Sequence, residues 1–212
     1  MRRLFATAAL LTFMATGSVE AGFPVPDGSF EQENAGGTNT YKYNPIGGAW
    51  SFTGNSGVIN GTSAFGNPLA QAGVQLAFLQ TNPNLAQGPG SPGVISETFT
   101  LGQGLYSLSL FEAARGGYAT PSYTIQANGI TIGGDTASST SFVNYTTSNF
   151  NFAGGSLTLT FTSTGSPTQD STTFLDNVTL SAVPEPASFA MLGFGLLASG
   201  GFYARKARRN RN

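Results

Sequence analysis

The stretch YTIQANGITIGG, residues 123–134, carries the clearest structural signal in this chain of 212 residues. Asn128-Gly129 stands between two runs of residues that favour β-strands. Asn and Gly readily adopt the positive φ angles that a two-residue hairpin turn requires. The stretch therefore predicts a β-hairpin whose turn is formed by Asn128 and Gly129.

Segments on both sides of this hairpin alternate apolar and polar residues, which is the period of a half-buried strand. They are VQLAFLQ (74–80), GLYSLSLF (104–111), SLTLTFT (156–162) and FLDNVTL (174–180). The last segment is expected to place Phe174, Asp176, Val178 and Leu180 on one face. No segment before residue 187 has a convincing helical period. Because each alternating strand must bury one face against another sheet, we expect one all-β domain, a two-sheet β-sandwich or jelly roll of about eight to ten strands.

Composition limits the chemistry that the chain can perform. It contains neither Cys nor His, which excludes disulfides, Ser-His-Asp and Cys-His nucleophiles and imidazole-bound metals. Between residues 22 and 182, two basic and eight acidic residues leave a formal charge of −6. Because an acidic surface without a basic patch repels phosphates, we expect no nucleic-acid partner.

The N-terminus has the order of an export signal. Arg2 and Arg3 precede the apolar run of residues 4–14, and small residues follow up to Ala21. Signal peptidase recognises this order. We therefore expect residues 1–21 to be a helical signal peptide that is removed after Ala21 during export through the inner membrane.

The C-terminus combines three features in a fixed order. The segment Val183-Pro184-Glu185-Pro186 precedes an uncharged run at residues 187–204. As a helix this run rises about 27 Å, close to the bilayer core of about 30 Å. The closing basic tail, residues 205–212, contains Arg205, Lys206, Arg208, Arg209 and Arg211. Such clusters stay cytoplasmic, so we expect a single transmembrane helix with the domain outside the membrane.

This order of elements resembles the PEP-CTERM sorting signal of exported proteins from Gram-negative bacteria. The resemblance covers residues 183–212 and implies that an exosortase, a membrane cysteine transpeptidase-like enzyme, recognises residues 183–186 in organisms that make exopolysaccharide. The helix would then be a transient inner-membrane anchor, and the mature protein would reside at the cell surface or outside the cell. A permanent anchor is the alternative, because hydrophobicity alone does not separate the two.

The domain between the two ends, residues 22–182, is similar to galactose-binding-like jelly rolls, which occur in carbohydrate-binding modules and bacterial surface proteins. The similarity lies in the order of VPDGSFE (25–31), Trp50, GVQLAFLQ (73–80), GVISETFTL (93–101), GLYSLSLFEAARGG (104–117) and TTFLDNVTL (172–180). It implies a structural calcium ion where the first and last strands meet, with Asp27 or Glu31 and Asp176 as ligands. Pairing of Asp176 with backbone amides is the alternative.

Sugar binding needs an aromatic platform together with polar groups for the hydroxyls. Tyr41 and Tyr43 lie near expected loops, and the glycan-binding candidates are Trp50, Arg115, Tyr118 and Tyr123. A core position for Trp50, and pairing of Arg115 with Glu112 or another carboxylate, are the stronger expectations for those two residues.

Carboxylate-dependent glycoside hydrolysis is a further alternative, because it needs no His. Its candidates in principle are Glu97, Glu112, Asp135 and Asp170. The chain has no nucleophile, phosphate-loop or metal-site motif, so we expect a protein that is not an enzyme. The expected function is a glycan-binding surface protein associated with exopolysaccharide or biofilm, and a passive structural protein is the alternative.

Overall fold

The computed structural model describes residues 22–84 and 91–183. Within these ranges the chain forms strands and no helix, which confirms the predicted all-β fold. The predicted signal peptide (1–21) and transmembrane helix (187–204) lie outside the described residues, and none of the described residues forms a helix suited to crossing a membrane. The strands are β1 (Gly22–Pro24), β2 (Thr40–Tyr43), β3 (Ser51–Thr53), β4 (Ser56–Asn60), β5 (Gln75–Thr81), β6 (Val94–Ala114), β7 (Ser122–Ala127), β8 (Ile130–Thr136), β9 (Val143–Thr146), β10 (Phe150–Ser163) and β11 (Ser171–Ala182).

Strands β7 and β8 form the hairpin predicted from residues 123–134. They pair antiparallel, and the turn residues Asn128 and Gly129 have φ angles of 48° and 80°. These angles lie in the left-handed region, which Asn and Gly adopt at low cost. The side chain of Asn128 also accepts the Thr158 N–H at 2.7 Å, so the turn is tied to β10 as well.

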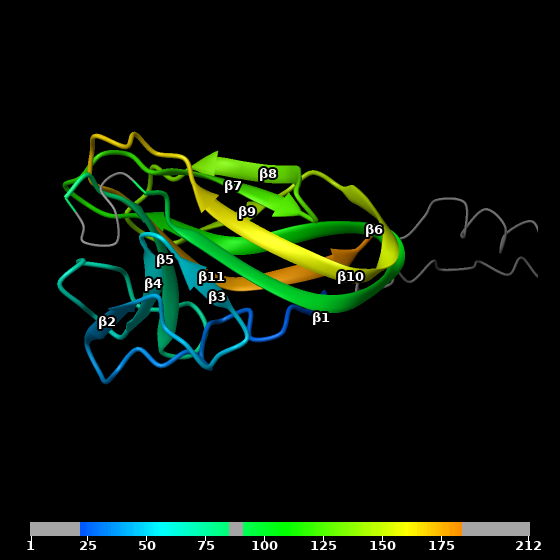
Figure 1. Cartoon of the computed structure of the whole chain (residues 1–212), viewed down its shortest axis with the longest axis horizontal. Coiled ribbons are helices and arrows are strands. Elements are labelled where there is room, and N and C mark those ends of the chain that lie inside the picture. Colours follow the sequence, from blue (N-terminus) through cyan, green and yellow to red (C-terminus); the bar gives the residue numbers. More distant parts are fainter. Residues whose placement is uncertain (1–21, 85–90, 184–212) are drawn as a thin grey trace, which may run out of the picture.

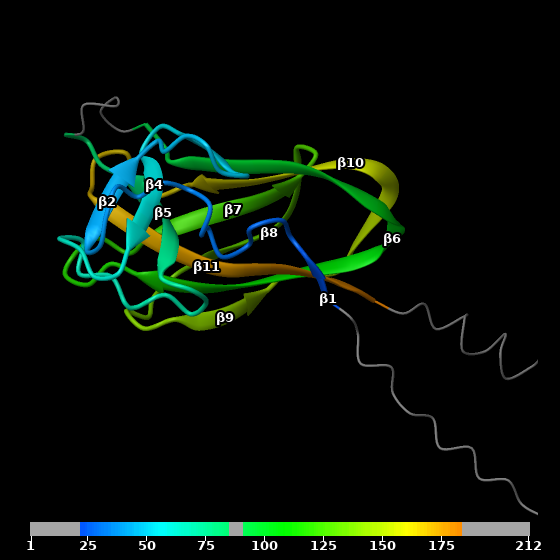
Figure 2. The ribbon, with the colours of Figure 1, turned by 90° about the horizontal axis from the view of Figure 1, so that it is seen from below.

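The strands form one continuous hydrogen-bonded sheet that folds into two layers, because the long strand β6 belongs to both. Residues 94–106 of β6 pair with β10, and residues 106–114 pair with β11. The first layer contains β3, β6, β10, β7 and β8, and the second contains β9, the end of β6, β11, β5, β4 and β2, with β1 beside β11. Figures 1 and 2 show these layers from two sides. The arrangement is the predicted two-sheet β-sandwich.

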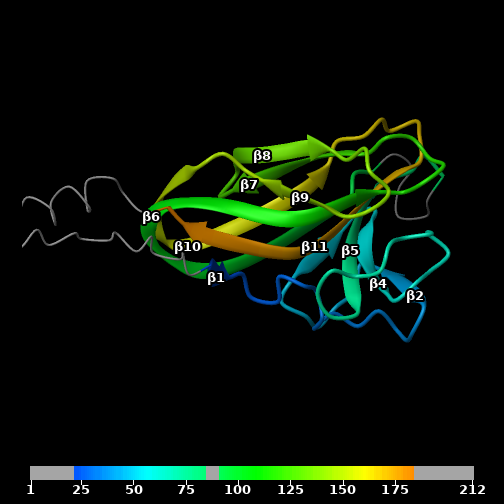
Figure 3. The same cartoon turned by 180° about the vertical axis from the view of Figure 1, so that it is seen from behind.

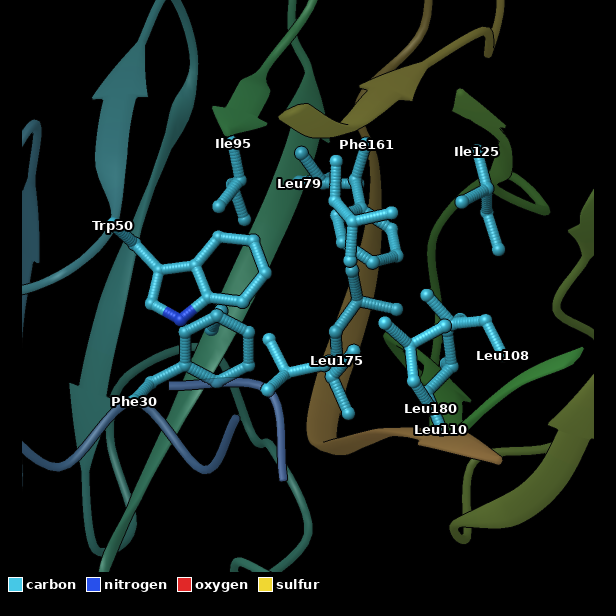
Figure 4. Packing of buried hydrophobic residues seen from close by; sticks show 14 of the residues in the cluster. Phe30, Trp50, Leu79, Ile95, Leu108, Leu110, Ile125, Phe161, Leu175 and Leu180 are labelled. Carbon is cyan, nitrogen blue, oxygen red and sulfur yellow. The ribbon is translucent and has the colours of Figure 1, made fainter. Parts of the chain in front are cut away.

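The main core lies between the two layers. Ile125 and Phe161 of the first layer and Leu108 and Leu175 of the second belong to one fully buried cluster. Figure 4 shows these side chains pointing into the space between the strands. Burial of such side chains contributes about 1.5–3 kcal/mol each and is the main source of stability.

A second apolar cluster lies on the outer face of the second layer, where the loop of residues 61–74 supplies Phe65. It comprises Ile59, Phe65, Leu76, Phe78, Ala113 and Phe174. As a result β5 is buried along its whole length, although its alternating sequence predicted one exposed face. The covering loop is the physical reason for the difference.

Strand β11 departs from the predicted alternation at a β-bulge. Its register with β6 shifts after Asp176, and Asn177 has a φ of 51°. Phe174 therefore lies in the outer cluster, whereas Val178 and Leu180 lie in the main core. The expectation that these side chains share one face is wrong, because an extra residue in a strand reverses the face on which later side chains lie.

Both ends of the described chain lie at the same end of the sandwich. Gly22 of β1 pairs with Ser181 near the end of β11, and Figure 3 shows β1 beside that end, with β2 and β4 at the opposite end of the molecule. The other end of β11 meets Arg115, whose N–H donates to the Thr172 carbonyl at 2.9 Å. From residue 172 to residue 182 an extended strand covers about 33 Å.

Candidate functional site

Two of the predicted glycan-binding residues come together just after β6 ends. The guanidinium carbon of Arg115 lies 3.7 Å from the centroid of the Tyr118 ring, a distance at which a cation and an aromatic face attract each other. Arg115 Nη2 also donates to the Tyr118 hydroxyl at 3.0 Å. Tyr118 is 48% exposed. Its ring is therefore held in place and still open to solvent.

Further contacts hold the Arg115 side chain in place against the Tyr118 ring. Its guanidinium carbon lies 4.7 Å from the centroid of the Phe65 ring, and its Nε donates to the Phe65 carbonyl at 3.1 Å. Its Nη1 lies 3.4 Å from Asp170 Oδ2. The expected pairing of Arg115 with a carboxylate is confirmed, and the partner is Asp170.

Tyr41 adds a second exposed ring that packs against Phe65. The ring centroids of Tyr41 and Phe65 are 4.8 Å apart at an interplanar angle of 77°. Tyr41 is 44% exposed, whereas Phe65 is buried. We call Tyr41, Phe65, Arg115 and Tyr118 the aromatic cluster. The sequence offered no signal for Phe65, because the loop that carries it has no regular period.

A network of polar side chains leads to Asp170, the carboxylate partner of Arg115. The Tyr43 hydroxyl donates to Gln80 Oε1, and Gln80 Nε2 donates to Asp170 Oδ1 at 2.7 Å. Burial raises the pKa of the Tyr43 hydroxyl, so this group remains a hydrogen-bond donor. The network orients the Asp170 carboxylate toward Arg115.

Trp50 does not belong to the aromatic cluster. It is 3% exposed, and its ring centroid lies 5.1 Å from that of Phe30 and 5.8 Å from that of Phe161. Its Nε1 donates to the Asp27 carbonyl at 2.9 Å. The core position that was the stronger expectation for Trp50 is confirmed, and Trp50 is not a sugar platform, because no face of its ring reaches solvent.

The prediction that Tyr123 forms part of a sugar platform is wrong, because its ring is buried. Tyr123 is 2% exposed, and its hydroxyl donates to the buried Glu112. Burial raises the pKa of Glu112 to about 7, the Tyr123 hydrogen bond opposes this rise, and the nearby Asp135 adds to it. A shallow hollow of about 430 Å³ lies beside these residues and includes Gly134.

The carboxyl pair beside this hollow does not suit glycoside hydrolysis. That reaction needs two carboxyl groups that both reach the sugar. Asp135 is exposed, but Glu112 is 2% exposed. Neither of the other two candidates offers a free carboxyl group for this reaction. Asp170 pairs with Arg115, and Glu97 is buried.

Two carboxyl groups, those of Glu33 and Glu97, are buried in the described domain. The sequence alone did not predict that both would be buried. Glu33 is 2% exposed and its Oε1 accepts the Trp50 N–H at 3.0 Å, while Glu97 is 5% exposed. The Oε2 atoms of both residues are buried without a hydrogen-bond partner in the described part of the chain. Burial raises the pKa of Glu33 to about 8 and that of Glu97 to about 7. The nearby Asp27 side chain is the second cause of both rises.

The carboxylates predicted to bind calcium accept backbone hydrogen bonds. Asp176 Oδ2 accepts the N–H groups of residues 71 and 72 at 2.5 and 3.0 Å, which confirms the alternative of pairing with backbone amides. Glu31 Oε1 accepts those of residues 74 and 75 at 2.8 and 2.6 Å. Both oxygens of Asp27 accept N–H groups of residues 31 and 32.

This arrangement does not fit a calcium ion. Calcium is bound by six to eight oxygen atoms, and here N–H donors point at the oxygens that would bind it. No group of three acidic side chains within residues 22–84 and 91–183 is placed to hold a metal.

Calcium is accordingly expected to have little effect on the folded domain. Adding millimolar calcium, or removing it with EDTA, should move the midpoint of thermal unfolding by less than about 1 °C, because an ion that does not bind the folded state does not stabilise it. Magnesium serves as the control for a general salt effect. A rise of several degrees that is specific to calcium would show that the three carboxylates rearrange around the ion.

The described domain is therefore a β-sandwich with an exposed aromatic cluster at one end and a proline-containing segment directly after its last strand. Residues 182–209 match the family described as the PEP-CTERM protein-sorting motif. The chain carries a PEP-CTERM sorting signal, which confirms the resemblance seen in the sequence. The motif implies an exported protein that is processed by an exosortase-type enzyme.

Solved structures with a similar arrangement of strands include several carbohydrate-binding modules. TmCBM61 in complex with β-1,4-galactotriose has 14% identity and a TM-score of 0.46, covering 72% of this chain and 95% of that one. The CBM22-1 xylan-binding domain of Paenibacillus barcinonensis Xyn10C has 15% identity and a TM-score of 0.44, covering 73% and 93%. The module CBM36 in complex with calcium and xylotriose has 16% identity and a TM-score of 0.40, covering 54% and 87%. These similarities are loose and concern the arrangement of the strands alone. No curated protein matches the chain.

Proposed function

We propose that this protein is displayed at the cell surface or in the extracellular matrix, and that its aromatic cluster binds a glycan of that layer. The observation that carries the proposal is the ring of Tyr118, which is 48% exposed and stacked on the Arg115 guanidinium. An aromatic ring held with one face in solvent can stack on the apolar face of a pyranose. Tyr41 supplies a second exposed ring, which packs against Phe65.

The charges around the cluster favour a neutral glycan. Arg115 is paired with Asp170, so its charge is already balanced by a carboxylate. Residues 22–182 carry a formal charge of −6, which disfavours an acidic polymer. The exopolysaccharide of the producing cell is the glycan most accessible to an exported protein with this sorting signal.

The position of the cluster agrees with this role. It lies at the end of β11 that is about 33 Å away from the sorting motif, by the rise of an extended strand. While the C-terminus is attached to the membrane or to another surface anchor, the aromatic cluster would therefore face away from the attachment point.

Replacing the two exposed rings tests the proposal. The Tyr118→Ala and Tyr41→Ala variants are expected to bind neutral exopolysaccharide at least about tenfold more weakly, a loss of about 1.4 kcal/mol, as measured by affinity electrophoresis or by pull-down with the purified polymer. Ile130→Ala is the matched control, because Ile130 is 71% exposed but lies at the β7–β8 turn.

The result also separates the two functional alternatives. Unchanged binding by both tyrosine variants would overturn the assignment of the site. If the unmodified domain shows no saturable binding to any polymer of the producing cell, the passive structural role replaces the glycan-binding one.

A further inference from the structure

The sorting motif begins inside the folded domain. The match to the motif starts at residue 182, and Ala182 is the last residue of β11. The next residue, Val183, still donates its N–H to the Leu105 carbonyl at 2.8 Å. No linker therefore separates the sheet from the proline-containing segment 183–186.

The residues just before the motif are paired on both edges. Strand β6 pairs with residues 179–182 through residues 106–109. On the opposite edge, β1 pairs with residues 179–181, and Gly22 lies opposite Ser181. The backbone hydrogen-bonding groups that precede the motif are thus directed to neighbouring strands.

An enzyme that acts on a peptide segment commonly binds it in extended form by adding it to the edge of a sheet. Such binding needs free backbone groups on at least one edge of the segment. If the enzyme binds residues 183–186, the residues that enter its cleft from the N-terminal side are 179–182. In the folded domain the edge formed by β1 must be vacated before the enzyme can pair with them.

Of the two neighbouring strands, β1 is the one that can leave at low cost. It spans only Gly22–Pro24 and, among the described strands, pairs with β11 alone. With the predicted cut after Ala21, β1 becomes the N-terminal segment of the mature chain, and terminal segments open with the smallest free energy. By contrast, β6 runs through both layers and pairs with several strands.

We propose that residues 179–183 are the N-terminal part of the segment that the processing enzyme binds, and that β1 is a clamp which must leave β11 first. The proposal rests on the exosortase-type processing that the sorting motif implies. In this arrangement β1, the first strand of the domain, controls access to the C-terminal sorting signal.

A reversible crosslink between the two strands tests the clamp. Because the chain contains no Cys, the double variant Pro24→Cys with Thr179→Cys introduces one possible disulfide between residues that are register partners. The pair Gly22→Cys with Ser181→Cys is the second choice if the first does not oxidise. In full-length protein presented to cells or membranes that contain the processing enzyme, the oxidised form is expected to be processed at least about tenfold more slowly than the same protein after reduction, as followed by mass spectrometry of the C-terminus.

Two further variants give the experiment its controls. Inserting roughly six Gly and Ser residues after Ala182 adds about 20 Å of extended chain and should restore processing of the oxidised protein. The same insertion in the exposed loop after Ser166 should not. Processing of the oxidised form at the rate of the reduced form would overturn the clamp. Absence of processing of the unmodified chain would instead refute the sorting assignment, and the clamp with it.

Discussion

Raising the pH from about 5 to about 8 is expected to lower the free energy of unfolding of the domain. The pKa of Glu33 is raised from 4.5 to about 8 by burial and by Asp27, and that of Glu97 is raised to about 7. Below pH 4.5 both carboxyl groups are protonated in the folded and the unfolded chain. As the pH rises through this window, the unfolded chain releases protons that the folded chain retains, so stability falls until the folded groups ionise as well.

The Glu33→Gln variant should remove much of this dependence. The amide keeps an oxygen that can accept the Trp50 N–H, and its NH₂ group can donate toward Asp27. Near pH 8 the variant is expected to be more stable than the unmodified domain by on the order of 2–4 kcal/mol, whereas near pH 4.5 the two should be similar. The measurement is urea unfolding at a series of pH values.

Glu97→Gln is the companion variant and should show a smaller gain over the same range. A free energy of unfolding that stays constant or increases between pH 5 and pH 8 would contradict the prediction. It would mean that the two buried carboxyl groups reach water or a cation in the folded domain.

The Trp50→Ala variant is expected to lose about 3–5 kcal/mol of stability, the usual cost of removing a large aromatic side chain from a core. The substitution leaves a cavity between Phe30 and Phe161 and removes the hydrogen bond from Nε1 to the Asp27 carbonyl. Trp50→Phe should cost less, because it fills most of the space and loses mainly the hydrogen bond. Urea unfolding at fixed pH measures both.

Tyr118→Ala is the matched control for Trp50, since both remove an aromatic ring. Tyr118 is 48% exposed, so its removal should change stability by less than about 1 kcal/mol. The two variants should therefore separate the effects: Trp50→Ala lowers stability, and Tyr118→Ala lowers glycan binding. Loss of binding without loss of stability in Trp50→Ala would contradict the core position of Trp50.

Much of the fold could be predicted from local sequence patterns. The hairpin at Asn128-Gly129, the alternating strands and the all-β class all depend on residues that are close together in the chain. The number of strands was less accessible, because the short strands β1, β3 and β9 are defined by the partners they pair with. The bulge at Asn177 was also hidden, since a register shift is visible only against the neighbouring strand.

The candidate site was predictable only in part. Arg115 and Tyr118 are close in sequence, and the structure stacks them. Phe65 and Asp170, which hold Arg115 in place, come from distant loops. Trp50 and Tyr123 had the right chemistry for a sugar platform, but their exposure depends on how the two layers close over them. Asp27, Glu31 and Asp176 likewise had the right chemistry for calcium. Their carboxylates instead accept hydrogen bonds from backbone N–H groups, most of which belong to distant parts of the chain.

The sequence by itself determined the all-β class, the hairpin and the sorting signal, because turn angles, strand alternation and a proline-containing motif before an apolar run are properties of neighbouring residues. Only the tertiary structure decided which aromatic rings are exposed, which carboxyl groups are buried, and that the sorting motif begins within the last strand. These features depend on contacts between residues far apart in the chain, and burial and strand pairing arise only when those residues meet.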